Sequence, residues 1–159
     1  MTPAQLQTLK TYINSVPAWA ALPLNSDSAF FLSDELAKDV SPAFIVWRTS
    51  VTRQEILQNG FDWTRLDNLS IGKARVWSDI FVDGSLNPSK LNVRAGLESV
   101  WVGTAQDLAV RAAIYIHCKR SANHVEKLFA TGTGSDASPA VMLIEGKLPY
   151  SEIEQARNS

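Results

Sequence analysis

The chain has 159 residues, of which 45% are hydrophobic and 19% charged, so it can form one domain with a substantial core and is too apolar for wholesale disorder. Its net charge of −1, from 15 basic and 16 acidic residues, argues against a strongly basic nucleic-acid-binding protein. A single cysteine, Cys118, excludes a disulfide scaffold and a zinc site built from cysteines.

Thr2, Pro3 and Gln5 form a helix-start signal: a hydroxyl cap, a proline at the first helical position and a glutamine three residues after the cap. Apolar residues then recur at three- and four-residue steps, at Leu6, Leu9, Ile13 and Val16. This spacing predicts an amphipathic helix that ends before Pro17.

A second helix is predicted over about residues 28–38. Its apolar residues are Phe30, Phe31, Leu36 and Ala37. The apolar run 43–47 fits a strand, an extended segment or a buried helical turn, and periodicity does not choose among them. Thr52 and Glu55 then form a capping box for a short helix, which we expect the Asn-Gly pair at 59–60 to stop.

Three longer helices are predicted over about residues 71–82, 87–102 and 104–119. In the last of them, helical spacing marks one apolar face, made of Leu108, Ala112, Tyr115 and Ile116. Its alanine-rich composition permits close packing against another helix. Ser121 is expected to cap a further short helix.

The composition changes after residue 130. Residues 131–139 are nine small or turn-forming residues, which predict a flexible loop. Residues 140–144 have the character of a strand that 145–147 could turn into a hairpin. Ser151 begins a capping box for a last helix of about two turns, and so short a helix needs something to pack against.

These elements predict a mainly α fold: a compact helical bundle of five to seven helices with a small C-terminal β arm or hairpin. The expected organisation is a helical body over 1–130, a flexible Gly/Ser/Thr loop over 131–139 and a C-terminal arm over 140–159. The longest apolar run is too short to span a membrane, and the first residues do not resemble a secretory signal.

The sequence predicts no catalytic, cofactor-binding or metal-ligating residue. Residues 132–135, Gly-Thr-Gly-Ser, lack the lysine of a phosphate-binding loop and follow a helix instead of a strand, which favours a surface loop or hinge. His117 and Cys118 are neighbours on a helix, where side chains point about 100° apart, so they do not easily share a metal. The carboxylates are scattered, and no spacing brings two of them together on one helix face.

Tryptophan and charge give the remaining signals. Four of the five tryptophans lie in or beside apolar segments, which favours core packing over subunit interfaces. The net charges of residues 1–47, 48–127 and 128–159 are −2, +3 and −2. The arginine-biased middle and the acidic ends could make head-to-tail contacts in a ring, although a solvated surface explains them as well.

Four stretches carry a combined pattern: SPAFIVWRTSV at 41–51, DWTRLDNL at 62–69, NPS with NVRAG at 87–89 and 92–96, and EKLFATGTG at 126–134. This combination resembles a family of small proteins encoded in tailed-bacteriophage and prophage structural modules, near capsid and tail genes. The resemblance extends over about residues 2–157.

The size and helical content look like those of a head–tail connector, also called an adaptor or head-completion protein. The resemblance implies a non-enzymatic virion protein, assembled in the host cytoplasm, whose ring, usually of twelve copies, surrounds the DNA channel at the head–tail interface. Its partners would be other copies of itself, the portal protein, a neighbouring neck or tail protein and, weakly, the packaged DNA backbone. In the arm, Tyr150, Ile153 and Arg157 are the hypothesised contact residues, chosen by position.

Other functions stay open. Within the same class, the chain could be a stopper, a tail terminator or a capsid-associated protein. From another class, it could be a small phage enzyme or a regulatory binding domain. Helix 105–119 has only Arg111 before its terminal basic pair, which argues against a DNA-reading helix. A lysozyme-like enzyme would need an acid in a cleft, such as Glu98 or Glu126.

Overall fold

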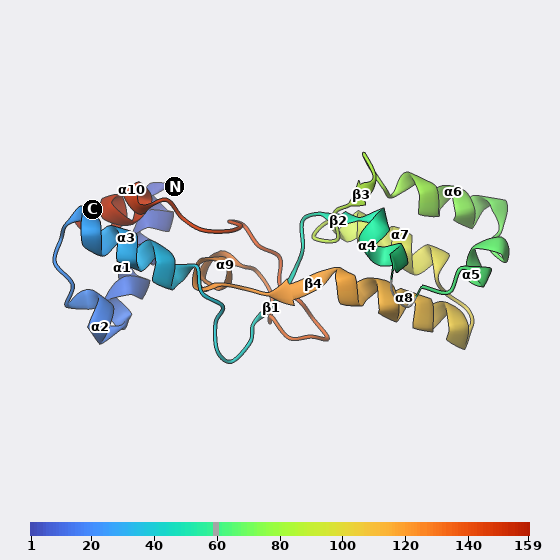
Figure 1. The fold of residues 1–159 in the computed structure, drawn as a ribbon, viewed down its shortest axis with the longest axis horizontal. Helices are drawn as coiled ribbons and strands as arrows, with labels where there is room; N and C mark the ends of the chain where they lie inside the picture. Colours follow the sequence, from blue (N-terminus) through green and yellow to red (C-terminus); the bar gives the residue numbers. More distant parts are fainter. Residues whose placement is uncertain (59–60) are drawn as a thin grey trace. The chain divides into compact units, whose positions relative to one another are not determined.

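A computed structural model describes residues 1–58 and 61–159 of the chain (Figure 1). The chain forms two compact units. Unit 1 combines Met1–Phe44 with Ser121–Ser159, and unit 2 holds Ile45–Arg120. The division therefore differs from the body, loop and arm expected from composition, because the two ends of the chain fold together. The helix stop expected at 59–60 lies outside the described residues.

The protein is mainly α, as predicted: 54% of it is helical, with a few short strands in two small sheets. The described residues form ten helices, which is more than the five to seven expected. Four of the ten are only four to six residues long. Two of these, Arg53–Gln58 and His124–Phe129, match the short helices predicted after Thr52 and after Ser121. The other two, Pro17–Ala20 and Thr64–Asp67, are single turns that show no periodicity of their own.

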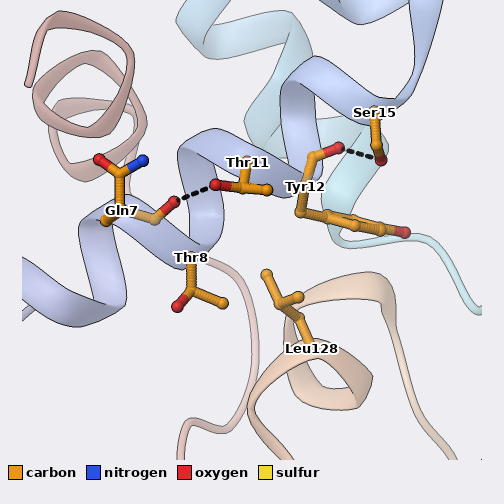
Figure 2. A pocket seen from close by; sticks show the side chains of 6 residues that line it. All are labelled: Gln7, Thr8, Thr11, Tyr12, Ser15 and Leu128. Atoms are coloured by element: carbon orange, nitrogen blue, oxygen red, sulfur yellow. Dashed lines mark hydrogen bonds between the residues drawn. The ribbon is translucent and has the colours of Figure 1, made fainter.

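Unit 1 contains five helices: α1 (Pro3–Ser15), α2 (Pro17–Ala20), α3 (Ser26–Leu36), α9 (His124–Phe129) and α10 (Tyr150–Asn158). The capping box predicted at the start of α1 is confirmed, because the Gln5 N–H donates to Thr2 Oγ1 at 3.2 Å and the Thr2 N–H donates to Gln5 Oε1 at 2.7 Å. On the exposed side of α1, Thr11 donates its hydroxyl hydrogen bond back to the Gln7 carbonyl at 2.9 Å (Figure 2).

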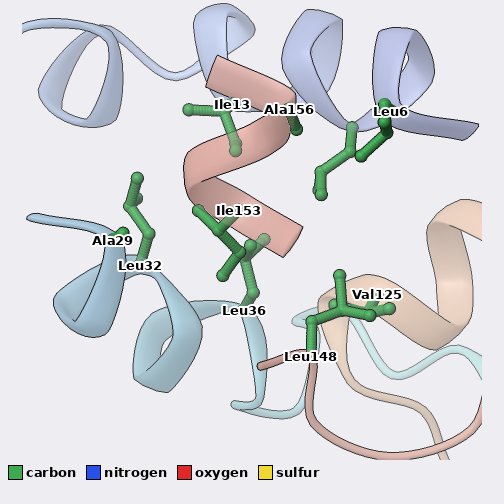
Figure 3. Packing of buried hydrophobic residues seen from close by; sticks show 10 residues of the cluster. Leu6, Ile13, Ala29, Leu32, Leu36, Val125, Leu148, Ile153 and Ala156 are labelled. Carbon is green, nitrogen blue, oxygen red and sulfur yellow. The ribbon is translucent and has the colours of Figure 1, made fainter. Parts of the chain in front are cut away.

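The core of unit 1 joins segments from both ends of the chain (Figure 3). It is made of Leu6, Leu9, Ile13, Ala29, Leu32, Leu36, Val125, Leu148, Ile153 and Ala156. Helix α1 supplies the first three of these residues, as its spacing predicts, and α10 packs against both α1 and α3. A helix of nine residues is marginal alone, so the terminal helix is stabilised by burying its apolar face in its own chain.

The C-terminal half of unit 1 differs from the expected details. Asn123, and not Ser121, caps α9, and α10 begins after Pro149 without a side-chain cap. Among the described residues, the expected strand over 140–144 is reduced to bridge residues at Ala140 and Val141. Val141 is bridged antiparallel to Thr131, and these two residues exchange two backbone hydrogen bonds of 2.9 Å. This bridge closes the small-residue loop at its base.

Unit 2 contains the remaining helices and short strands. They are β1 (Ile45–Trp47), β2 (Val51–Thr52), α4 (Arg53–Gln58), α5 (Thr64–Asp67), α6 (Ile71–Asp79), β3 (Ser85–Leu86), α7 (Leu91–Val100), α8 (Ala105–His117) and β4 (Lys119–Ser121), of which β4 runs to the boundary with unit 1. β1 pairs with β4, so the ambiguous run 43–47 contains a strand. β2 pairs antiparallel with β3, with Val51 opposite Leu86.

The capping box predicted in front of α4 is also confirmed. The Glu55 N–H donates to Thr52 Oγ1 at 3.1 Å, and the Thr52 N–H donates to Glu55 Oε2 at 2.8 Å. Arg48 adds an ion pair to the same carboxylate at 2.9 Å. The Thr52 backbone hydrogen bond, followed by the Arg48 guanidinium, lowers the pKa of Glu55 to about 2.

Aromatic rings form much of the core of unit 2. Trp77 and Trp101 are buried, and their ring centroids lie 5.4 Å apart in an edge-to-face arrangement. Phe61 stacks on Trp77 at 5.7 Å. Trp63, which meets the edge of Phe61, is more than half exposed. Core packing, the favoured interpretation of the tryptophans, therefore describes Trp77 and Trp101 but not Trp63.

Candidate functional site

The three hypothesised contact residues of α10 have different surroundings. Ile153 is fully buried in the core of unit 1. Arg157 donates hydrogen bonds to the carbonyls of Leu22 and Pro23, at 2.6 and 2.9 Å, and so holds the chain between α2 and α3. Tyr150 is the exposed member of the three. Because α10 is part of the core, deleting residues 140–159 would remove packing from α1 and α3, and would not test a contact with a partner.

Tyr150 belongs to an exposed aromatic patch, which we define as Phe30, Phe31 and Tyr150. The Phe30 and Tyr150 rings stack at 4.0 Å with an interplanar angle of 20°. Phe30 is 52% exposed and Phe31 is 48% exposed, although both are apolar residues of α3. A hollow of about 300 Å³ adjoins the stack, and Leu148 and Pro149 also line it. Phe30 lines this hollow, and its neighbour Phe31 adds to the exposed apolar surface of α3.

Helix α8 has two apolar faces. Val110 and Ile114 are buried within unit 2, together with Cys118 just past the end of the helix. The second face is exposed and consists of Ala105, Leu108, Ala109, Ala112 and Ile116. The two faces are offset by two positions, or about 200° around the helix. The apolar face marked by the sequence is therefore largely the exposed one: Leu108 is 46% and Ile116 is 74% exposed.

The charges separate between the two units. Unit 1 has five basic and nine acidic side chains, a net charge of −4. Unit 2 has ten basic and seven acidic side chains, a net charge of +3. The acidic ends of the sequence thus fold into one unit, and most of the basic middle forms the other. Both exposed apolar surfaces lie within this pattern, the aromatic patch on the acidic unit and the α8 face on the basic one.

A hollow of about 390 Å³ lies along α1 in unit 1 (Figure 2), and a second hollow of about 250 Å³ adjoins it. They share Tyr12 and Leu128, and the second is also lined by His124 and Lys127. The Tyr12 hydroxyl and His124 Nδ1 are 2.5 Å apart, and the Trp19 ring meets both rings edge-on. Burial raises the pKa of Tyr12 and, ahead of the charge on Lys127, lowers that of His124.

Cys118 and the main chain of His117 take part in structural contacts. Cys118 is buried, and burial raises the pKa of its thiol to about 12. The His117 carbonyl accepts a hydrogen bond from Arg48 Nη1 at 3.0 Å. His117 belongs to unit 2 and His124 to unit 1. In the glycine-containing loop, Gly134 adopts a φ of +67° and lies so close to Phe44 that a Cβ atom would come within 2.1 Å of its ring.

The most buried carboxylate has a structural environment as well. Glu126 in α9 is 1% exposed. Its two oxygens accept hydrogen bonds from the Asn123 N–H at 3.0 Å and the Gly146 N–H at 2.8 Å. The Asn123 side chain accepts a hydrogen bond from the Glu126 N–H through Oδ1 at 2.8 Å and donates one from Nδ2 to the Gly146 carbonyl at 3.2 Å. This network fastens the segment before α10 to α9. Glu98, the other acid considered, accepts a hydrogen bond from the Tyr115 hydroxyl at 3.1 Å.

Two absences concern the described residues alone. Within residues 1–58 and 61–159, no three His, Cys, Asp or Glu side chains gather in a group that could hold a metal ion. None of the helices in these ranges combines the length and the apolar character needed to cross a bilayer.

Sequence reasoning missed the aromatic patch and the exposure of the α8 face. The sequence does carry a signal for the exposed face of α8. Apolar residues recur at 108, 112 and 116 and also at 110, 114 and 118, so the helix is apolar on two opposite sides. The fold of unit 2 buries the side with Val110 and Ile114 and leaves the other side exposed. No protein-family model matches the chain, no curated protein matches it, and no solved structure matches its fold.

Proposed function

We propose that the chain is a non-enzymatic structural protein of a tailed-phage virion, a head–tail connector whose copies form a ring between portal and tail. The observation that carries this proposal is the separation of charge, −4 on unit 1 against +3 on unit 2. Opposite net charges favour contact between unlike units of neighbouring copies. Contacts between unlike surfaces are heterologous, and heterologous contacts close into rings when the rotation between copies permits.

Two further features support this function. The four sequence stretches that resemble the phage structural-module family lie in both units, so the resemblance is not confined to one of them. Unit 2 also carries a net charge of +3, and its exposed basic residues Arg75 and Lys90 could face a DNA channel. Contacts of this kind bind the phosphate backbone weakly and weaken steeply as salt is raised.

The test is copurification with the portal protein of the same phage genome, followed by negative-stain imaging. We expect a collar of this chain beneath the portal ring. The double variant Arg75→Glu and Lys90→Glu replaces two exposed basic residues of unit 2, and should reduce the amount of collar formed. As the matched control, Lys10→Glu and Lys38→Glu make the same charge change in unit 1 and leave the two units oppositely charged.

Two outcomes would contradict the connector function. If the chain fails to bind the portal and instead decorates tail tubes or capsid shells, it is a stopper, terminator or capsid-associated protein. If the chain is absent from virions, it does not belong to the structural class, and an enzymatic or regulatory role takes its place.

A further inference from the structure

We infer that neighbouring copies of this chain meet through the exposed face of α8 on one copy and the aromatic patch of unit 1 on the next. The partner of the α8 face is therefore a second copy of the chain, bound head to tail. This inference rests on the proposed function for its biological setting, and names the surfaces by which the copies of the ring would touch.

The α8 face has the composition of a helix–helix contact. Three of its five residues are alanines, which let a partner helix approach to about 8–10 Å between axes. Leu108 and Ile116 project from the same face. A helix that is apolar on opposite sides is typical of a helix buried on both. The fold of unit 2 covers the side with Val110 and Ile114.

The aromatic patch is the complementary surface. Phe30 and Phe31 belong to α3, so the patch presents a helix to a helix. The hollow beside the Phe30–Tyr150 stack, of about 300 Å³, can receive an aliphatic side chain. Leu108 and Ile116 are side chains of that kind. Aromatic residues are enriched at the centres of protein interfaces, and the fully buried core of an interface is more apolar than the rest of the surface.

Charge selects this pairing over the contact of two identical surfaces. Helix α3 contains Asp27, Asp34 and Glu35 and no basic residue. Lys147, which also lines the hollow, pairs with Asp34, and Lys38 pairs with Glu35, so the acidic character of this surface rests on Asp27 and on the net charge of unit 1. On α8, the carboxylate of Asp107 is paired with Arg65 at 2.5 Å, which leaves the cation Arg111 on the helix. The units that bear these helices have net charges of −4 and +3. Two α8 faces, or two aromatic patches, would bring like charges together.

The experiment detects contact between copies even when association is weak. A ¹⁵N-labelled chain is mixed with an unlabelled chain that carries a nitroxide on Leu24→Cys, an exposed position just before α3. The buried Cys118 does not take the label. Because only one copy is isotopically labelled, the broadening reports contact between copies. We expect it at the exposed α8 residues, and we expect it to decrease as salt is raised.

Two blocking substitutions show which surfaces are used. Ala112→Asp places a carboxylate in the α8 face, and Phe30→Asp places one in the patch; both positions are exposed, so unit folding is retained. A labelled Phe30→Asp chain mixed with a nitroxide-bearing Ala112→Asp chain still has one intact surface on each side, and should broaden at α8 as the wild type does. In the reverse mixture, of a labelled Ala112→Asp chain and a nitroxide-bearing Phe30→Asp chain, the α8 face of the labelled chain and the patch of the nitroxide-bearing chain are both blocked, and the broadening at α8 should fall at least tenfold. Ala74→Asp, an exposed alanine of α6, is the matched control and should have no effect.

Several results would overturn this inference. They are no broadening at millimolar concentration, broadening on another surface, or loss of broadening with Ala112→Asp but not with Phe30→Asp, which would indicate a symmetric contact between two α8 faces. Its failure is distinguishable from failure of the proposed function. A collar on the portal without contact at α8 supports the connector function and contradicts this interface. Contact at α8 without portal binding supports the interface and contradicts the connector function.

Discussion

Replacing Glu126 by alanine should destabilise unit 1 by roughly 3 kcal/mol. The substitution removes the acceptor of two backbone N–H groups, those of Asn123 and Gly146. An unsatisfied buried donor costs about 1–3 kcal/mol. Asn123 is buried and belongs near the upper end of that range, whereas Gly146 is half-buried, so water partly replaces the lost bond.

Glu126→Gln is the matched control for this prediction. Its single carbonyl oxygen can still accept from one of the two N–H groups, but its amide nitrogen is a donor facing a donor. We therefore expect roughly half the loss seen with alanine.

The assay is urea unfolding followed residue by residue in ¹H–¹⁵N spectra. Amide signals from Leu9 and Ile13 report on unit 1, and that of Leu97 in α7 serves as an internal reference in unit 2. If Glu126→Ala lowered the stability read from α1 by less than about 1 kcal/mol, or left it equal to that of the glutamine variant, the buried acceptor would not have the role assigned to it.

Three other predictions follow from the local geometry. Gly134→Ala should lower the melting temperature by more than Gly146→Ala, because both glycines have positive φ but only at Gly134 does the new Cβ collide with the Phe44 ring. Equal losses of melting temperature would argue against the packing of Gly134 on Phe44. Hydrogen bonds from the Thr52 backbone and the Arg48 guanidinium lower the pKa of Glu55 from 4.5 to about 2, so the ionised Glu55 stabilises the fold fully above pH 4.5 and less as the pH falls towards 2. The free energies of unfolding of wild type and Glu55→Gln should therefore converge at low pH, whereas a difference that stays constant with pH would contradict the lowered pKa. Because Cys118 is buried and the pKa of its thiol is raised, it should resist a thiol reagent at neutral pH in the folded chain and react once the chain is denatured. Rapid labelling of the folded chain would show that the Cys118 thiol is accessible to solvent.

Local signals in the sequence predicted local structure well. The capping boxes at Thr2 and Thr52 both form, because each depends on groups three residues apart. The apolar face of α1 is correct for the same reason, since one helical repeat determines which side chains share a side. Pro17 also marks a boundary, as predicted: α1 ends at Ser15, and Pro17 is the first residue of α2.

Features that depend on distant partners were not predictable in this way. Helix α8 has two apolar faces of equal spacing, and only the packing of unit 2 decides that Ile114 is buried and Ile116 exposed. Phe30 is apolar and helical, but α10 covers the opposite side of α3, where Leu32 and Leu36 lie. The apolar run near the C-terminus pairs through Val141 with Thr131, ten residues earlier in the chain, and the described residues 145–147 do not turn it into a hairpin.

The interleaved order of the two units affects how the chain can fold as it is synthesised. Helices α1 and α3 leave the ribosome first, but α9 and α10, which complete their core, are made after all of unit 2. Unit 2 therefore has every residue it needs while the apolar faces of α1 and α3 are still uncovered. In the nascent chain these apolar faces stay exposed to solvent, or bound by chaperones, until the last segment is translated. Slow translation through Ile45–Arg120 would therefore prolong an aggregation-prone intermediate.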